Sequence, residues 1–373
     1  MTDLRNNGPQ SAQDAAGPDA VRDAFRRQAR ICPTLGSPFM GILMAGLAEG
    51  LAPGAPVPDA ILGWRGRPWA DALALRVAGG LHALARSGAR PALTAAYPGG
   101  TGGDLITQAL AALNEDHAYL LPWLSSAPQT NEVGRSSVLL GGALYAAARL
   151  SMPLEVLEIG SSAGLNLMFD RWRHDLGDGR IWGPLGAPAT VIGNWQGATP
   201  PLSAPLLIAA RAGCDLRPVD ASDAAARARM LAYIWPDQSD RLTRAGAALS
   251  AVAAAGVIPE AADAGAWLGA RMARNQARGT ARMLIHTITW QYLPEGTRTA
   301  IRGTMAGAAL RATDAAPLVW LRMEPDGAEE DASIRLTIWP GGEGRELGRG
   351  DFHGRWARWH DTPKPIPAGG PGI

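Results

Sequence analysis

The stretch Leu154-Glu155-Val156-Leu157-Glu158-Ile159-Gly160-Ser161-Ser162-Ala163-Gly164-Leu165-Asn166-Leu167 decides the fold. Its first six residues form a short apolar run, which predicts a buried strand, and the small residues that follow predict a tight turn before a helix. Small residues let the backbone approach a ligand closely, and the free N–H groups of a first helical turn suit an anionic or hydrogen-bond-accepting group. The stretch therefore predicts a small-molecule site at Gly160–Gly164.

Glu158 stands two residues before the first glycine, at the carboxyl end of a strand that we expect to be buried. A buried carboxylate needs a partner, and a ligand that carries a positive charge or hydroxyl groups would supply one. The alternative is a turn that only packs a helix against a sheet, since glycine also permits that contact.

Glu158, Gly160 and Gly164 resemble the first motif of class I S-adenosylmethionine-dependent methyltransferases, with Ser162 where the middle glycine usually stands. The Ser162 side chain is expected to narrow the room for the methionine part of the cofactor. The resemblance implies S-adenosylmethionine as cofactor and a small-molecule methyl acceptor. The cofactor contacts that we assign inside the turn are Glu158, Gly160, Ser161, Ser162, Gly164 and Asn166.

The same letters also fit the G-x-S-x-G nucleophile elbow of α/β-hydrolases, with Ser162 as the nucleophile. Histidines and acids for a triad follow at His286, His353, His360, Asp314, Glu324 and Asp326. In a hydrolase, however, several strands precede the elbow, whereas the chain before Leu154 has helical spacing. A third reading is a non-catalytic protein that keeps the fold as a ligand sensor, since fold does not determine function. Enzymatic activity is therefore left open.

Downstream of the turn, short apolar runs alternate with helical stretches, which is the pattern of βαβ units and a parallel sheet. Strands are expected at 154–159, 206–214, near 257–258, at 283–290 and at 318–323. Helices are expected at 165–176, 224–254, about 264–277 and 295–312, with a kink or an end at Pro236 in the second. The runs 334–339 and 346–356 predict an antiparallel hairpin that closes the sheet edge.

Upstream of Met152, apolar residues recur at spacings of three and four, which predicts helices. We expect an α-helical N-terminal region at 19–150 and an α/β domain with a Rossmann-like, methyltransferase-type sheet at 151–362. This sheet should be mostly parallel, with the antiparallel hairpin near the C-terminus. Residues 1–18 and 363–373 are rich in small and polar residues, Gly and Pro, and should be flexible tails.

Further candidate residues follow the later strands, because ligands of doubly wound sheets bind outside the carboxyl ends of the strands. The methyltransferase resemblance implies Asp215, with Asp220 nearby, for the ribose and Asp263 for the adenine. Asp220 is equally explained as a helix cap or a loop acid.

Polar and aromatic residues gather after the fourth predicted strand. His286 and Tyr292 are the candidates for a catalytic base, and Gln291 for substrate binding; a buried core histidine beside packed aromatic rings is the alternative. Asn131, Glu132 and Arg135, just before the helix that leads into the first strand, are candidates for substrate binding, although Glu132 and Arg135 would also suit a solvated surface pair.

Composition limits the classes of function. The 373 residues are 47% hydrophobic and 18% charged, with 35 basic and 34 acidic residues and a net charge of +1, so no overall field attracts nucleic acid or an anionic membrane. Cys32 and Cys214 fit no disulfide framework, and six scattered histidines show no metal spacing. No secretory signal or membrane-spanning run is evident. We therefore expect a cytoplasmic protein without a metal; its oligomeric state is left open.

The strings TNEVGRS, LEIGSSAGLNL, GCDLRPVD, WPDQSDR and TWQYLP together resemble a bacterial family described as domain of unknown function 2332, from about Phe25 to Trp359. This resemblance implies a methyltransferase-like sheet behind an α-helical N-terminal region and brings no established activity.

Overall fold

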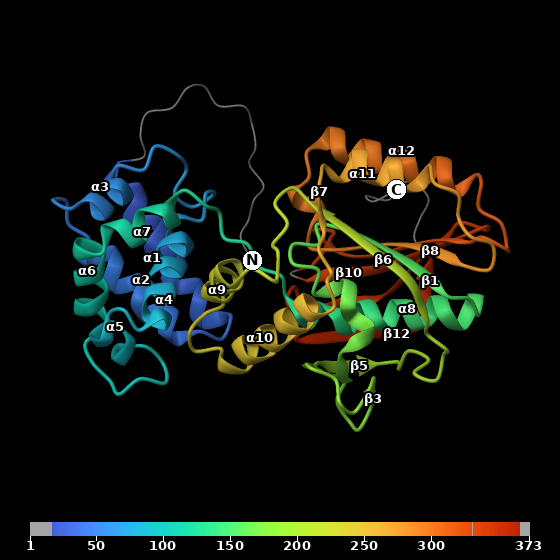
Figure 1. Cartoon of the computed structure of the whole chain (residues 1–373), viewed down its shortest axis with the longest axis horizontal. Helices are drawn as coiled ribbons and strands as arrows, with labels where there is room; N and C mark the ends of the chain where they lie inside the picture. The colour runs from blue at the N-terminus through green and yellow to red at the C-terminus, as the bar shows by residue number, and fades with distance from the viewer. Residues whose placement is uncertain (1–16, 330, 366–373) are drawn as a thin grey trace. The chain divides into compact units, whose positions relative to one another are not determined.

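The computed structural model describes residues 17–329 and 331–365 and divides into two compact units (Figure 1). Among the described residues, the helical unit combines 17–130 with Ala224–Thr243, and the sheet unit combines Asn131–Asp223 with 244–329 and 331–365. Residues 1–16 and 366–373 of the two expected tails lie outside the described residues. The last described residues, 363–365, belong to a strand rather than to a tail.

The helical unit is built from short helices whose apolar faces meet in one core, around fully buried residues such as Phe25, Leu43 and Leu81. Proline opens α1, α2, α3 and α5, where its missing N–H removes no helical hydrogen bond. The helices are α1 (Pro18–Thr34), α2 (Pro38–Gly50), α3 (Pro56–Leu62), α4 (Leu73–Ser87), α5 (Pro91–Ala96), α6 (Leu105–Glu115), α7 (His117–Leu124) and α9 (Ala224–Ala232).

The expected helix at 224–254 is broken in two, as Pro236 predicts. Helix α9 ends at Ala232 and α10 (Ser239–Ala254) begins after Trp235-Pro236-Asp237-Gln238. The Asp237 carboxylate accepts hydrogen bonds from the Ser37 hydroxyl and, at 3.0 Å, from the Phe39 amide at the start of α2. The segment thus caps a helix of the helical unit and forms a structural corner between α9 and α10.

The sheet unit contains a nine-stranded mixed sheet with the order β5-β12-β11-β10-β9-β8-β1-β6-β7 and a small sheet with the order β3-β2-β4. The parallel strands are β1 (Leu154–Ile159), β6 (Ile208–Asp215), β7 (Glu260–Ala261), β8 (Ala281–Thr287) and β9 (Leu318–Pro325). The antiparallel part follows with β10 (Ala332–Trp339), β11 (Glu343–Gly350) and β12 (Trp356–Pro365), and β5 (Asn194–Gly197) pairs in parallel with β12. The small sheet consists of β2 (Arg173–Asp175), β3 (Ile181–Trp182) and β4 (Thr190–Ile192).

Helices cover both faces of the parallel strands (Figure 1). Helix α8 (Ser136–Leu150) packs with Val156 and Met283 on one face, whereas α11 (Ala264–Met272) and α12 (Glu295–Ala309) pack with Leu157 and Leu284 on the other. Neighbouring strand residues point to opposite faces, so these strands are apolar on both sides, as expected for a covered parallel sheet.

The strand order places a reversal between β1 and β8. From β1 the chain adds β6 and then β7 on one side, returns, and adds β8 and β9 on the other. At such a topological switch point the loops after neighbouring strands diverge, and ligands of open α/β sheets bind outside the carboxyl ends of the strands there. The turn after β1 lies at this point.

Several predicted elements differ from the structure. The helix expected at 165–176 is a short 3₁₀ segment, η2 (Asn166–Arg171), followed by β2, because strand pairing and burial of Trp172 and His174 fix this stretch. The strand expected near 257–258 lies at Glu260–Ala261, and Ile258 is exposed. The predicted hairpin exists as β10 and β11, but β12 and β5 continue the sheet beyond it. Helix α8, which we assigned to the helical region, belongs to the sheet unit.

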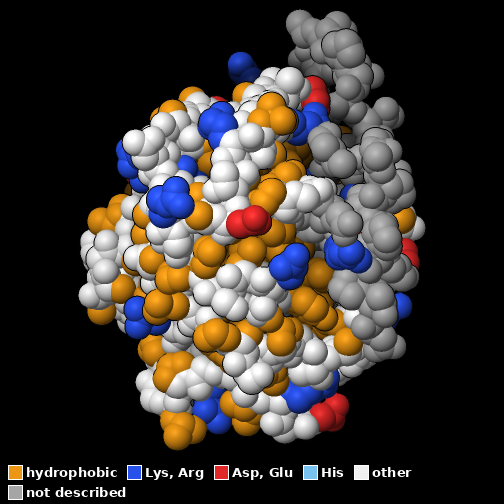
Figure 2. Space-filling model, turned by 90° about the vertical axis from the view of Figure 1, so that its right-hand side faces the viewer, with side chains coloured by type: hydrophobic (Ala, Val, Ile, Leu, Met, Phe, Trp, Pro, Cys, Tyr) orange, Lys and Arg blue, Asp and Glu red, His pale blue; other side chains and the backbone are white. Residues whose placement is uncertain are grey.

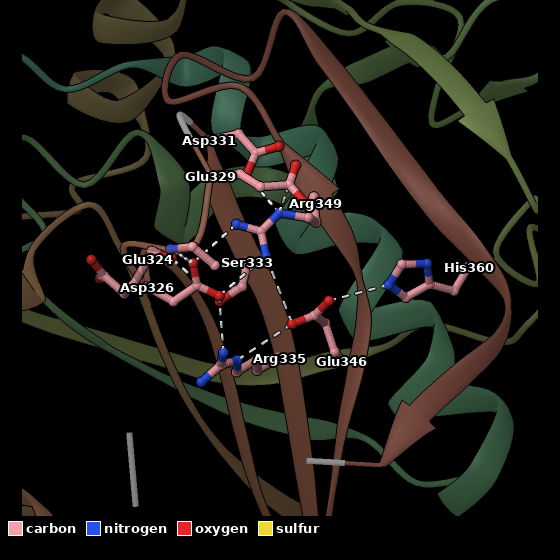
Figure 3. A network of polar contacts seen from close by, with 10 residues as sticks. Glu324, Asp326, Glu329, Asp331, Ser333, Arg335, Glu346, Arg349 and His360 are labelled. Carbon is pink, nitrogen blue, oxygen red and sulfur yellow. Dashed lines mark hydrogen bonds and ion pairs between the residues drawn. The ribbon is translucent and has the colours of Figure 1, made fainter. Parts of the chain in front are cut away.

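The antiparallel strands carry a network of ion pairs on one face (Figure 3). Arg349 on β11 holds Asp326 with two hydrogen bonds of 3.0 and 3.1 Å and Asp331 with one of 2.6 Å. Arg335 on β10 adds a bond of 3.0 Å to Asp326, and His360 on β12 contacts Glu346. These charges are paired with one another, which accounts for their burial without requiring a ligand.

The sheet-unit face in Figure 2 shows hydrophobic and neutral groups with Lys and Arg side chains scattered between them. No helix in the described ranges is long and apolar enough to cross a membrane.

Candidate functional site

The turn after β1 has a left-handed backbone conformation, which residues other than glycine adopt with difficulty. Gly160, Ser162 and Gly164 all have positive φ, at 71°, 52° and 80°. A Cβ at Gly160 would also collide with the side chain of Thr289, which follows β8. Glycine is therefore required at residue 160, both by the left-handed backbone and by the close approach of a neighbouring loop.

Glu158 is buried directly beneath this turn, with 2% of its surface exposed, and its Oε2 atom has no hydrogen-bond partner among the described residues. Burial raises the pKa of Glu158 to about 8, although the Ser161 hydroxyl and the positive Arg135 favour the charged form; Asp215 adds to the rise. The carboxyl thus has hydrogen-bonding capacity that the described protein groups leave unused.

The Ser162 hydroxyl is the second polar group of the site without a partner, because its buried Oγ atom has no hydrogen-bond partner among the described residues. Its backbone N–H donates to Asp215 Oδ2 at 3.0 Å, and its carbonyl oxygen accepts from the Val219 amide at 3.0 Å. The other carboxylate oxygen of Asp215 accepts from the Arg217 amide at 2.9 Å. Asp215, at the end of β6, therefore fixes the turn after β1.

The segment before α8 reaches the same end of the sheet. Asn131 Oδ1 accepts from the Leu165 amide at 2.9 Å, just after the turn, and Asn166 Oδ1 accepts from the Ser136 hydroxyl, also at 2.9 Å. Both asparagine side chains are buried, so they brace the turn from the protein side.

Glu132 and Arg135 do not form the solvated surface pair that we considered. Glu132 is buried and accepts from the Gly134 amide, at the start of η1 (Val133–Arg135). Arg135 donates to the carbonyl oxygens of Phe352 and Thr287, at 2.9 and 3.1 Å. Arg135 thus joins the end of β8 to the loop after β11, beside the Glu158 turn.

The loop after β8 is strained at Ile288, whose φ is 51°. A β-branched side chain is a marked outlier in this region, and such strain persists only where surrounding contacts enforce it. Here the Ile288 amide donates to the Met323 carbonyl oxygen at 2.9 Å, and the Thr289 amide donates to both Glu324 carboxylate oxygens, at 3.0 and 3.1 Å. Strained residues thus follow both strands that flank the switch point, Ser162 after β1 and Ile288 after β8.

His286 does not suit the role of catalytic base. It is 1% exposed, its Nδ1 lies 2.6 Å from Glu324 Oε1, and the Trp320 indole N–H donates to its Nε2 at 3.0 Å. An indole nitrogen can only donate, so Nε2 is the acceptor and Nδ1 carries the proton that Glu324 accepts. Both ring nitrogens are therefore occupied, and the structure favours the core histidine that we considered as the alternative.

Gln291 and Tyr292 lie on the 3₁₀ segment η3 (Trp290–Tyr292), where both side chains are exposed and Tyr292 keeps 67% of its surface accessible. Asp220 and Asp263 make local contacts instead. Asp220 accepts from the amide and hydroxyl of Ser222, and Asp263 caps α11 through the Gly265 and Ala266 amides and accepts from the Thr297 hydroxyl. The structure thus gives both acids local structural roles and shows neither of them bonded to the turn.

A serine-hydrolase triad is not formed in the part of the chain that the structure describes. Ser162 Oγ has no hydrogen-bond partner, whereas a serine nucleophile needs a histidine within hydrogen-bond reach. His286 is occupied by Glu324 and Trp320, and His360 contacts Glu346.

Thr289 and the positioning role of Glu324 were missed by the sequence reasoning, which considered Glu324 only as a triad acid. Glu324 lies near the end of β9, on the neighbour of β8, so an acid near the end of the next parallel strand was the available signal. Within the described ranges, no cluster of three or more His, Cys, Asp or Glu residues is suited to hold a metal ion.

A family model described as an uncharacterized protein conserved in bacteria matches residues 22–359, so the chain belongs to this family, domain of unknown function 2332. The family assignment made from the sequence strings is confirmed. No curated protein and no solved structure matches the chain.

Proposed function

We propose that the chain is an S-adenosylmethionine-dependent methyltransferase for a small-molecule acceptor that is not yet identified. The observation that carries the proposal is the pair of buried groups without protein partners, Glu158 Oε2 and Ser162 Oγ, in a left-handed turn at the switch point of the sheet. Unpaired buried polar groups are rare in native proteins, and those in a turn after the first parallel strand are well placed to receive a ligand.

The strand order supports this proposal. In chain order, the parallel strands β7-β6-β1-β8-β9 lie as 3-2-1-4-5, as in Rossmann-type sheets that bind nucleotides. In a cofactor-bound protein, Glu158 would accept from the methionine ammonium group and Asp215 would lie toward the ribose. Asp215 is already held by two backbone amides, which fixes its position before a ligand arrives.

Catalysis would rest mainly on alignment, because the methyl group of a sulfonium ion is already activated and needs an acceptor held in line. The occupied His286 leaves Tyr292, near the end of β8, as the proposed base where the acceptor carries a proton. Gln291, Glu132, Asn131 and Arg135 are proposed on the acceptor side.

A thermal-shift titration with S-adenosylhomocysteine tests the proposal. At a hundredfold excess over its dissociation constant, a ligand of the folded state adds about 2.7 kcal/mol. We expect a rise in Tm of a few degrees that Glu158→Ala abolishes and that Glu295→Ala, a change in an exposed ion pair on α12, retains. Absence of a shift for the wild-type protein at millimolar ligand would overturn the proposal.

Turnover separates an enzyme from a ligand sensor on the same fold. The wild-type protein, incubated with methyl-labelled S-adenosylmethionine and a bacterial small-molecule extract, should transfer label to a compound in the extract. Binding of S-adenosylhomocysteine without any transfer would favour the sensor, for which the Ser162 side chain in the turn is the supporting observation.

A further inference from the structure

The Glu158 carboxyl group is buried, since only 2% of the residue is exposed. Its neighbours across the strands are Gly213 on β6 and Ile285 on β8, and neither carries a charge. Three titratable or charged groups act on it. Arg135, the last residue of η1, donates hydrogen bonds to the carbonyl oxygens of Phe352 and Thr287. Asp215 and Cys214 lie at the end of β6. No ion pair links Glu158 to a cationic side chain in the described ranges, and its Oε2 atom lacks a hydrogen-bond partner.

An ionised carboxylate in such a place would be a buried charge without a counterion, which is highly unfavourable, and proteins avoid this by leaving the group neutral. Burial raises the pKa of Glu158 to about 8, in agreement with this geometric argument. At neutral pH and without a ligand, the group therefore carries its proton. A ligand that brings a positive charge to Oε2 would reverse the balance, because an adjacent cation favours the carboxylate.

We propose that Glu158 is a proton-exchange site for a ligand ammonium group, so that binding of an aminocarboxylate ligand releases the carboxyl proton to solvent. In the step, Glu158–COOH and R–NH₃⁺ become the ion pair Glu158–COO⁻···⁺H₃N–R, and one H⁺ leaves. No covalent bond other than the carboxyl O–H bond breaks. The inference rests on the proposed function, since S-adenosylmethionine carries such an ammonium group.

Proton exchange makes affinity depend on pH. Below the pKa of the free carboxyl, the dissociation constant of an ammonium ligand should fall ~10-fold for each pH unit gained and level off above about pH 8. A ligand without an ammonium group should show no such dependence.

Isothermal titration calorimetry of the full chain with S-adenosylhomocysteine measures the exchange directly. At each pH the apparent heat is compared in two buffers that differ in their ionisation heat, phosphate and imidazole at the lower pH and Bicine and Tris at the higher, to count released protons. We expect about one proton per bound ligand at pH 6.5 and about a quarter of a proton at pH 8.5, as the free carboxyl ionises. 5′-Methylthioadenosine, which lacks the amino-acid part, should bind without releasing a proton.

Two variants sharpen the test. Glu158→Gln should abolish the proton release, whereas Glu155→Gln, a matched change on the same strand at a residue that pairs with Arg282, should retain it. Binding of S-adenosylhomocysteine to the wild-type protein without proton release would overturn the exchange and leave the proposed function standing. Absence of any binding would overturn both.

The empty protein gives a check that needs no ligand. Glu158→Gln replaces the neutral acid by a neutral amide that does not titrate. As the pH increases from 5 to 8.5, the wild-type protein loses stability, because it must either keep its carboxyl protonated or bury a charge. The free energy of unfolding of the variant should therefore rise relative to that of the wild-type protein over this range. A stability difference between the two proteins that is constant over this range would overturn the inference.

Discussion

Gly160 and Ser162 have similar left-handed backbones, yet the structure places different demands on them. At Gly160 a side chain would meet Thr289 from the loop after β8, whereas Ser162 keeps its side chain and leaves the hydroxyl without a partner. The serine that departs from the usual glycine pattern therefore stands where the fold tolerates a Cβ, and the glycine that must be kept is Gly160.

Gly160→Ala should lower the free energy of unfolding more than a left-handed backbone alone explains. Gly179 offers the matched control, because its φ of 74° is almost the same as the 71° of Gly160 and nothing lies within 4 Å of an added Cβ. We expect a loss of about 1 kcal/mol for Gly179→Ala from the backbone and a further loss of about 1–3 kcal/mol for Gly160→Ala from the collision with Thr289. Urea denaturation measures both, and equal losses would contradict the close approach.

Prediction of single residues from the sequence succeeded where the residue follows directly from the strand-turn pattern, as for the burial of Glu158. For His286 the sequence left a catalytic base and a core histidine both open, because the groups that occupy its two ring nitrogens, Glu324 and Trp320, lie on β9, 38 and 34 residues away along the chain. Spacing along one segment cannot show which side chain of a neighbouring strand fills a hydrogen-bonding position.

At the scale of elements, the long periodic segments were predictable and the short paired ones were not. Strands β1, β6, β8 and β9 and the break at Pro236 follow from local apolar runs and from proline, whose effects lie within the segment. Strands β2 to β5, by contrast, are two to four residues long and exist through pairing with distant partners, such as β5 with β12. The apolar spacing of residues 165–176 also fits a helix, and only these tertiary contacts decide against it.

The C-terminal end of helix α8 has a strained backbone that a substitution can relieve. Its last residue is followed by Ser151, which is left-handed with φ 51° and ψ 38°, a position where glycine is usual. Ser151→Gly should raise the free energy of unfolding by about 0.5 kcal/mol, because relief of backbone strain outweighs the greater freedom of glycine in the unfolded chain. The reciprocal change at the end of α4, Gly88→Ala with φ 70° and no steric contact, should lower it by about 1 kcal/mol.

Urea denaturation monitored by far-UV circular dichroism checks this pair of variants. A higher free energy of unfolding for Ser151→Gly and a lower one for Gly88→Ala would show that both effects arise from the left-handed backbone at the helix end. A loss at Ser151 would contradict the assigned backbone conformation.

At the scale of the whole molecule, each of the two units contains a buried histidine. His82 lies in the helical unit, where its Nδ1 contacts the Ala232 carbonyl oxygen, and His174 lies in the sheet unit, where its Nε2 contacts the Phe169 carbonyl oxygen. Burial lowers the pKa of each histidine to about 4. Both units therefore contain a neutral histidine that acid would have to charge.

The sign of the pH effect follows from these shifts. Unfolded histidine takes up a proton as the pH falls below about 6.5, while the folded protein holds the ring neutral down to about 4, so each histidine makes the protein less stable between these values. The loss is at most about 3 kcal/mol for each residue. Because His82 and His174 lie in different units, acid should weaken both.

His82→Gln should therefore flatten the acid side of the stability profile even though it changes a buried contact at neutral pH. The amide can still donate to the Ala232 carbonyl oxygen but does not titrate, so the variant should lose less stability than the wild-type protein between pH 6.5 and 4.5, by up to about 2 kcal/mol. His117→Gln is the control, because His117 is exposed and its replacement should leave the profile parallel to that of the wild-type protein. Guanidinium denaturation at each pH measures the difference. If His82→Gln lost stability in parallel with the wild-type protein, His82 would have to accept a proton in the folded helical unit, and the burial that keeps it neutral would be contradicted.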